Sequence, residues 1–345
     1  MKQIYKEVQD WTTRGGRFAI ATVVKTWRSS PRLSGSAMFI DESGKFIGSV
    51  SGGCIEGAVI SESEEVIRTG NPKLLQYGVD NDLAWSVGLS CGGAIEVFLE
   101  PFWGVGTNSS ERFAWDSLVE CLEKDQTCVL VSKLTRGTGH HIFIHDRNGG
   151  GSLGDQDLTQ PVHRVFQDQE NQVVIADNVQ YFLQIFPCRD HLLIIGAAHI
   201  SIDLVRLAHE FGFKSTVIDP RGLFTQSLEK WVRPDQIIKS WPEEALSTVQ
   251  LDAYTYAVVL THDPKIDDEA LKILLESDVA YIGALGSKRT HEKRLSRLRE
   301  MGFSEKLLDR IRGPVGVDIG AKEPREIALS ILAEIIKIKR TSKVL

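Results

Sequence analysis

Two cysteines in glycine-rich stretches are the residues of this chain best suited to chemistry on a ligand. Cys54 follows Gly52 and Gly53, and Cys91 precedes Gly92. Glycine has no Cβ and adopts positive φ angles freely, so such loops let a ligand approach the backbone closely. The residues after Cys54 have a helical pattern, and a helix N-terminus stabilises a thiolate. We therefore predict a reactive sulfur here; the alternative for both cysteines is a small buried hydrophobic residue.

A polar loop between residues 28 and 36 is a candidate anion site. Arg28 and Arg32 lie on either side of two serines and a proline. A guanidinium group binds phosphate or carboxylate through two parallel hydrogen bonds, so the two arginines suit either group. The alternative is an exposed arginine loop without a ligand, which composition alone favours.

The segment from residue 191 to 221 has the pattern of a strand, a helix and a second strand. A turn runs from Gly196 through His199, and Asp219 follows at about the 20-residue distance that dinucleotide-binding folds use for a ribose-binding acid. Ala198 and Ser201 stand where that motif has its second and third glycines. The helix N-terminus still offers N–H groups to a phosphate. A nucleotide site and a Rossmann-type scaffold without a nucleotide fit this pattern equally well.

Two later turns also follow strand-like segments. Gly283 and Gly286 lead into Ser287 and a helix with two basic residues in its first turn, a combination that suits a phosphate. A tight turn with solvated basic residues is the alternative. His262 directly follows another strand, where it would act on a ligand as an acid or base, or simply complete the turn.

The chain has the pattern of an α/β protein with two domains, residues 1–186 and 187–345. Its length allows two separate cores. Short strands with few helices predict a mixed-sheet α+β N-terminal domain, in which residues 148–178 are polar and expected to be irregular. Regular alternation of strands and helices from residue 191 onward predicts a Rossmann-like C-terminal domain, with a parallel sheet covered on both faces.

Composition excludes several classes of protein. The net charge of −6 argues against a nucleic-acid partner. No apolar stretch reaches the roughly 20 residues that span a membrane, and the first residues do not resemble a signal peptide, so we expect a cytoplasmic protein without a membrane partner. Five cysteines without a C-x-x-C pair predict neither a disulfide framework nor a structural zinc site.

Taken together, these motifs resemble the xanthine dehydrogenase accessory factor family, also called the XdhC and CoxI family. The resemblance covers nearly the whole chain and rests on residues 30–32, 52–56, 91–93, 196–199, 219–221, 261–263, 281–287 and 316–320. The family's turn at residues 196–199 usually reads Gly-Ala-Gly-His, from which this chain departs at Ala198.

The resemblance implies a chaperone that binds the molybdenum cofactor (molybdopterin), protects it during sulfuration and inserts it into xanthine dehydrogenase or a related molybdenum hydroxylase. Such a client enzyme is the expected partner, a cysteine desulfurase is a further candidate partner, and we expect a homodimer. Cys54 and Cys91 would hold the molybdenum, because thiolates are soft ligands. Arg28 or Arg32, with the Gly196 or Gly286 turn, would hold the phosphate. A nucleotide is a further candidate ligand of the Rossmann-like domain.

Two other functions fit the same sequence. An NAD(P)-dependent oxidoreductase would use the C-terminal domain, although Ala198 argues against it. A structural component of a molybdenum hydroxylase would co-purify with the enzyme and carry no cofactor alone. The chain is not expected to be xanthine dehydrogenase itself, because it lacks the C-x₄-C-x₂-C pattern of an iron–sulfur site. No catalytic residue is predicted.

Overall fold

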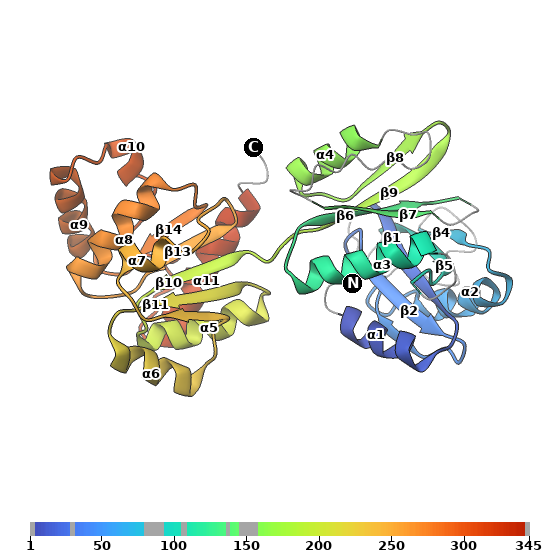
Figure 1. Ribbon diagram of the computed structural model, residues 1–345, viewed down its shortest axis with the longest axis horizontal. Coiled ribbons are helices and arrows are strands. Elements are labelled where there is room, and N and C mark those ends of the chain that lie inside the picture. Colours follow the sequence, from blue (N-terminus) through green and yellow to red (C-terminus); the bar gives the residue numbers. More distant parts are fainter. Residues whose placement is uncertain are drawn as a thin grey trace. The chain divides into compact units, whose positions relative to one another are not determined.

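A computed structural model describes residues 4–27, 32–78, 93–104, 109–135, 139–144 and 158–341. The chain divides into two compact units, Met1–Cys188 and Arg189–Leu345 (Figure 1). The division lies two residues after the boundary that the sequence suggests. Within the described ranges, no helix is long and apolar enough to cross a membrane.

Unit 1 contains a five-stranded antiparallel sheet in the order β3-β2-β1-β5-β4. Its strands are β1 (Phe18–Trp27), β2 (Ala37–Asp41), β3 (Phe46–Gly48), β4 (Lys73–Tyr77) and β5 (Ala94–Pro101). Helix α2 (Glu56–Thr69) covers one face, whereas α1 (Tyr5–Arg14) and α3 (Ser109–Glu123) pack on the other. Because both faces are covered, the first seven residues of the central strand β1 are all buried.

A second antiparallel sheet in unit 1 has the order β7-β6-β9-β8. Its strands are β6 (Cys128–Lys133), β7 (His140–Ile144), β8 (Gln172–Ala176) and β9 (Val179–Phe186). Helix α4 (Thr159–Asp168) packs on it through Val162 and Val165. The prediction of an irregular segment is therefore wrong over α4 and β8, whose few apolar residues are diluted by polar ones in the sequence.

Unit 2 is built on a six-stranded parallel sheet in the order β12-β11-β10-β13-β14-β15. Its strands are β10 (His191–Ile195), β11 (Lys214–Ile218), β12 (Gln236–Ile238), β13 (Thr255–Val259), β14 (Tyr281–Ala284) and β15 (Ile311–Arg312). The chain leaves β10 toward β11 and β12, and returns to β13 on the other side of β10. This reversal makes β10 and β13 the topological switch point, where α/β folds bind ligands.

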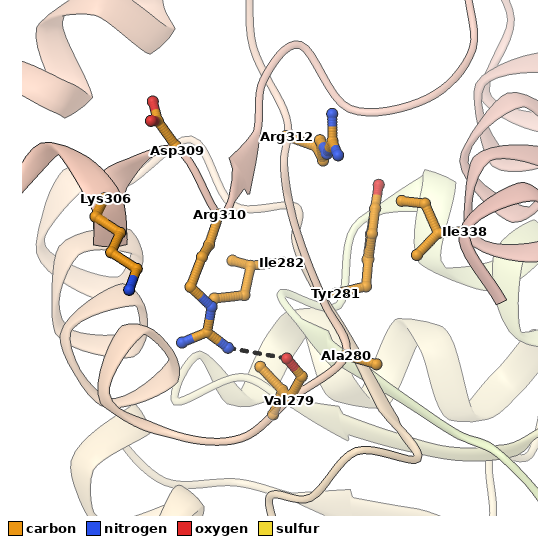
Figure 2. A pocket seen from close by; sticks show the side chains of 9 residues that line it. All are labelled: Val279, Ala280, Tyr281, Ile282, Lys306, Asp309, Arg310, Arg312 and Ile338. Carbon is orange, nitrogen blue, oxygen red and sulfur yellow. Dashed lines mark hydrogen bonds between the residues drawn. The ribbon is translucent and has the colours of Figure 1, made fainter. Parts of the chain in front are cut away.

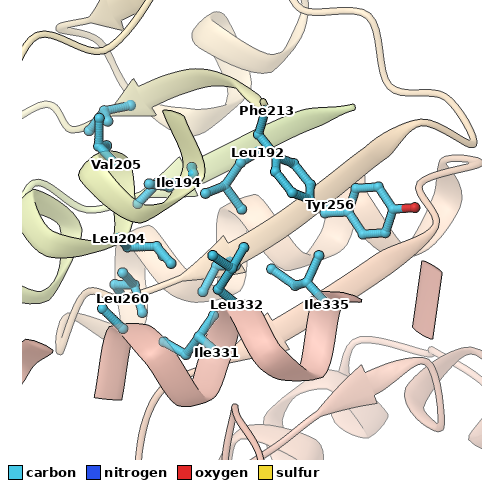
Figure 3. Close-up of a cluster of buried hydrophobic side chains, with 14 of the residues drawn as sticks. Leu192, Ile194, Leu204, Val205, Phe213, Tyr256, Leu260, Ile331, Leu332 and Ile335 are labelled. Atoms are coloured by element: carbon cyan, nitrogen blue, oxygen red, sulfur yellow. The ribbon is translucent and has the colours of Figure 1, made fainter. Parts of the chain in front are cut away.

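Helices cover both faces of this sheet, which confirms the prediction of a Rossmann-like domain. Helices α5 (His199–Glu210), α6 (Gly222–Trp231) and α11 (Pro324–Thr341) pack on one face. Figure 3 shows Leu204 of α5 and Ile331 of α11 packed with strand residues such as Leu192 and Ile194. The other face carries α7 (Pro242–Leu246), α8 (Pro264–Glu276), α9 (Lys288–Glu300) and α10 (Glu305–Leu308).

Candidate functional site

Cys54 lies on the loop between β3 and α2, and its side chain is partly exposed. Gly52 and Gly53 beside it have φ angles of 83° and 122°. A Cβ on either glycine would meet no atom within 4 Å. The backbone angles, not crowding, therefore require these glycines, and the surface of the loop next to Cys54 is bare backbone.

The Glu56 carboxylate fixes the shape of this loop from inside. It accepts hydrogen bonds from the backbone N–H groups of residues 50–53 at 2.8–3.2 Å, and from the hydroxyls of Ser49 and Ser51 at 2.7 and 2.5 Å. Burial alone would raise its pKa, but the hydrogen bonds from Ser51 and Ser49 prevail and lower the pKa of Glu56 to about 2. The loop is thus built around an anion that belongs to the chain itself.

The helix begins later than its sequence pattern suggests. Helix α2 starts at Glu56, and the N–H groups of Cys54 and Ile55 both donate to the Ser51 hydroxyl oxygen at 3.0 Å. Since Ser51 and Glu56 accept from the N–H groups of residues 50–55, the loop presents a sulfur and bare backbone rather than an anion pocket.

Three predicted binding residues, Arg28, Cys91 and Gly92, lie outside the described residues, so the convergence of the two cysteines stays a prediction. Arg32 is described and exposed. The remaining cysteines differ from Cys54 in burial or position: Cys121 and Cys128 are buried in the core, and Cys188 is half-buried at the end of unit 1.

In unit 2, four turns lie side by side at the carboxyl edge of the parallel sheet. Ile195 at the end of β10 pairs in register with the last residues of β11 and β13, and β13 ends level with β14. The turns after these strands hold Gly196, Asp219, His262 and Gly286, which the fold therefore brings to one edge. His199 and His262 are both exposed there.

Asp219 supports the Gly196 turn. It is fully buried, and its Oδ2 accepts from the N–H of Ala197 at 2.8 Å. Arg221 donates to both carboxylate oxygens through its guanidinium group, at 2.9 and 2.8 Å. Burial would raise the pKa of Asp219, but the hydrogen bonds from Arg221 and Ala197 lower it below its usual value. Both oxygens that would bind a ribose are thus occupied by the chain itself.

Close packing at the switch point explains Gly196. Its φ is 111°, and a Cβ would lie 2.7 Å from the Thr261 side chain and 3.0 Å from the Thr261 nitrogen. Ala198 has an extended backbone with φ of −81°, which tolerates a side chain. Ser201 is buried and its hydroxyl donates to the Gly196 carbonyl at 2.6 Å. The two residues that replace motif glycines therefore fit the turn without strain.

The predicted residues of the last turn, Gly283, Gly286 and Ser287, have different structural roles. Gly283 lies inside β14, where a Cβ would meet the side chains of Val315 and Tyr281 at 2.5 and 2.6 Å, so packing accounts for it. Gly286 has a φ of 139°. Ser287 caps α9, because its hydroxyl accepts from the Thr290 N–H at 3.2 Å.

Arg294 and Asp267 form a buried charged pair close to this edge, which the sequence pattern did not lead us to predict. Arg294 of α9 is almost fully buried and donates to Asp267 at 3.3 Å and to the Leu285 carbonyl at 2.8 Å. Asp267 in turn accepts a short hydrogen bond from Thr261. Burial raises the pKa of Asp267 despite these partners. The helical spacing of Arg294 from buried Leu298 was the signal that could have placed it on the inner face of α9.

A second buried charged cluster lies in unit 1. His140 stacks on Trp103 with ring centroids 4.0 Å apart, and its Nε2 lies 3.1 Å from a Glu100 oxygen. Burial opposes the charged ring, but Glu100 and Glu111 prevail and raise the pKa of His140 to about 9. Across the part of the chain that is described, no three His, Cys, Asp or Glu residues form a metal-binding group.

Comparison with known families matches both units. The XdhC and CoxI family model matches residues 11–78, which include the Cys54 loop. The XdhC Rossmann domain model matches residues 192–335, which include the carboxyl edge of the parallel sheet. The chain belongs to the XdhC and CoxI family.

Relatives of this XdhC and CoxI family member match along most of its length. A protein of Bacillus subtilis described as a probable subunit of xanthine dehydrogenase is 29% identical over 327 residues, 93% of each chain. The molybdenum cofactor insertion chaperone PaoD of Escherichia coli is 26% identical over 326 residues, 93% of this chain and 83% of PaoD. The crystal structure of a xanthine dehydrogenase from Bacillus halodurans has a TM-score of 0.74 at 27% identity, covering 97% of this chain and 95% of that one.

Proposed function

We propose that this protein binds the molybdenum cofactor and holds it during sulfuration and insertion into a molybdenum hydroxylase such as xanthine dehydrogenase. Family membership and similarity to the chaperone PaoD support a role in the maturation of this cofactor. Similarity to the probable xanthine dehydrogenase component of Bacillus subtilis supports a client of that class.

The placement of Cys54 carries the proposal. Its partly exposed sulfur stands beside bare glycine backbone, on a loop that Glu56 holds in one shape. A thiolate is a soft ligand that suits molybdenum, and bare backbone lets a flat pterin approach closely. When bound, the cofactor supplies the metal and its terminal sulfur. Cys54 would bind the metal, with Cys91 as a second thiol on the strength of the sequence.

The phosphate of the cofactor needs donors other than those of the Cys54 loop, which Glu56 already uses. Arg28 and Arg32 remain the candidates in unit 1. In unit 2 the candidates are the N-termini of α5 and α9, which begin at the exposed residues His199 and Lys288.

An oxidoreductase that uses NAD(P) is the weaker proposal. Asp219 commits both carboxylate oxygens to Ala197 and Arg221, which leaves no acceptor of the usual kind for the ribose hydroxyls. A nicotinamide titration decides between the two functions: saturable binding with hydride transfer supports the enzyme, and its absence supports the chaperone.

The decisive experiment measures molybdenum and pterin on protein purified from a molybdate-fed host. We expect Cys54→Ser, and more strongly Cys54→Ser with Cys91→Ser, to lower the bound cofactor by about tenfold or more. Cys188→Ser is the matched control, since Cys188 is also a half-buried cysteine of unit 1. Unchanged retention in the double variant would remove the thiols from the mechanism. A wild-type chain without cofactor that co-purifies with the hydroxylase would instead indicate a structural component of that enzyme.

The remaining parts of the proposal concern partners. A cysteine desulfurase is the proposed source of the cofactor sulfur, and the proposed assembly is a homodimer in the cytoplasm. Co-purification with a desulfurase and light scattering of the isolated chain test these two points separately.

A further inference from the structure

A pocket of about 370 Å³ opens in unit 2 next to the starts of β14 and β15. Val279 and Ala280, which directly precede β14, line it, as does Arg310, which directly precedes β15. It therefore lies toward the amino edge of the parallel sheet, away from the turns at the carboxyl edge. The volume is within the range of roughly 300–1,000 Å³ that is typical of small-molecule sites.

The lining of the pocket is strongly basic. It contains three cations, Lys306, Arg310 and Arg312, and one carboxylate, Asp309, so its side chains sum to a charge of +2. Figure 2 shows the amine of Lys306 on the same side as the guanidinium group of Arg310, with Arg312 toward the opposite end. This concentration of positive charge stands out in a chain whose net charge is −6.

No ion pair within the described residues neutralises these cations. Arg310 donates to the carbonyl oxygens of Leu275 and Val279 at 2.6 and 2.9 Å, which fixes its guanidinium group without an opposing charge. Lys306 and Arg312 are exposed, and neither forms an ion pair with any residue that the structure describes. A rigid arginine flanked by two unpaired cations is a suitable arrangement for an anion.

Apolar side chains complete the walls. Ile338 of α11 is half-buried and gives the pocket an apolar wall, whereas Ile282 and Tyr281 of β14 are almost fully buried behind it, with the Tyr281 hydroxyl donating to Glu334 at 2.5 Å. Carbon surface of this kind covers the uncharged part of a ligand, whereas the cations hold its charged groups.

We propose that this pocket binds a small dianion with a short carbon body, either a phosphate monoester or a dicarboxylate. The charge of +2 selects two negative charges, and the volume limits the ligand to a small molecule. None of the residues that line this pocket belongs to the cofactor site proposed above, so the failure of one proposal leaves the other standing.

Calorimetric titration of the full chain at low ionic strength tests this inference, with glycerol phosphate and succinate as probes. We expect saturable binding of one probe, and about tenfold weaker binding by Lys306→Ala with Arg312→Ala, since each removes a charge-assisted contact. Lys230→Ala with Arg325→Ala is the matched control, because it removes one exposed lysine and one exposed arginine that do not line the pocket. We expect this control to bind within about twofold of the wild type.

The probe that binds more tightly identifies the class of anion. The proposal is overturned if neither probe binds saturably, or if the control variant loses as much affinity as the pocket variant, since the effect would then reflect total charge alone. Lys306→Gln, a single change at an exposed position, gives a second measurement if the double variant is unstable; unchanged binding by that variant would also contradict the proposal.

Discussion

The Cys54 loop of unit 1 and the Gly196 turn of unit 2 are each held in shape by a carboxylate, but the carboxylate comes from a different part of the fold in each case. Each is a glycine turn that leads into a helix, and in each a buried carboxylate of the chain binds backbone N–H groups. Glu56 comes from the helix that follows its own loop. Asp219 comes from the end of the neighbouring strand and is paired with a cation, Arg221.

The difference determines what each turn leaves available. Glu56 anchors its loop locally, so Gly52 and Gly53 face open space and Cys54 is reachable. Asp219 anchors a turn that is also packed against Thr261, so Gly196 has no free surface on that side. A local anchor suits a loop that must present a side chain, whereas a tertiary anchor suits a turn that must hold two strands together.

The strongest test of this comparison removes the tertiary anchor. We expect Asp219→Asn to lower the free energy of unfolding by about 3–5 kcal/mol, because it leaves Arg221 without its buried partner. Urea unfolding measures the change. Asp203→Asn, which breaks the exposed pair with Arg206, should change stability by less than about 1 kcal/mol. Equal effects of the two variants would show that Asp219 does not anchor the turn.

The glycines provide the next test. Gly196→Ala should destabilise unit 2 by about 3 kcal/mol, because it combines a strained φ with contacts to Thr261 that are too close. Gly52→Ala should cost only about 1 kcal/mol, since its Cβ would face open space and only the backbone angle resists it. Thermal unfolding of the two variants checks the order, and a reversed order would contradict the distinction between an open and a packed turn.

Removal of the local anchor has a smaller expected effect. Glu56→Gln replaces the oxygen that accepts from Gly53 and the Ser51 hydroxyl by a donor, so we expect a loss of about 2 kcal/mol and faster alkylation of Cys54. Because the pKa of Glu56 is lowered from 4.5 to about 2, its contribution is present above about pH 4.5 and is lost as the pH falls toward 2. In Glu56→Gln, the free energy of unfolding should therefore lack the contribution that the wild type loses between pH 4.5 and 2.

The control for this variant is Glu64→Gln, an exposed glutamate on the same helix. It should leave both unfolding and the alkylation rate of Cys54 unchanged. Added acetate should partly restore Glu56→Ala, because the small carboxylate fills the vacated position among the N–H groups. An absence of rescue together with unchanged alkylation would remove Glu56 from the placement of Cys54.

The last test changes pH rather than a turn, and concerns a third buried carboxylate, Glu100, whose partner His140 titrates. The pKa of His140 is raised to about 9 from 6.5, so its pairing stabilises the fold fully below about pH 6.5 and is lost as the pH rises through 9. The free energy of unfolding of the wild type should be lower at pH 9 than at pH 6.5 by at most about 2–3 kcal/mol. In His140→Gln this difference should disappear; a persistent difference would assign the pH dependence to another group.

Sequence patterns succeeded where structure is local. The alternation of strands and helices after residue 191 predicted elements that the structure contains. They failed for α4 and β8, whose burial depends on packing between elements rather than on a strong local pattern. The sequence indicated that each of the four turns at the carboxyl edge follows a strand, and these turns lie together because parallel strands end at one level.

The hydrogen bonds that join Asp219 to Ala197 and Arg294 to Asp267 could not be predicted from the sequence, because each links segments distant along the chain. The order of residues placed Asp219 as a ribose acid, but its register beside β10 puts the carboxylate within hydrogen-bonding distance of Ala197, where Arg221 also binds it. The burial of Arg294 against Asp267 likewise follows from the packing of α9 on α8, over residues 27 positions apart.

By itself, the sequence determined the family and the α/β fold class and placed Cys54 on a glycine-rich loop, because each depends on residue types and on spacing along the chain. Only the tertiary structure decided which polar groups are still available to a ligand. Whether a carboxylate can accept hydrogen bonds from a ligand depends on how many donors other segments bring within hydrogen-bonding distance. Those distances are set by packing rather than by order in the chain.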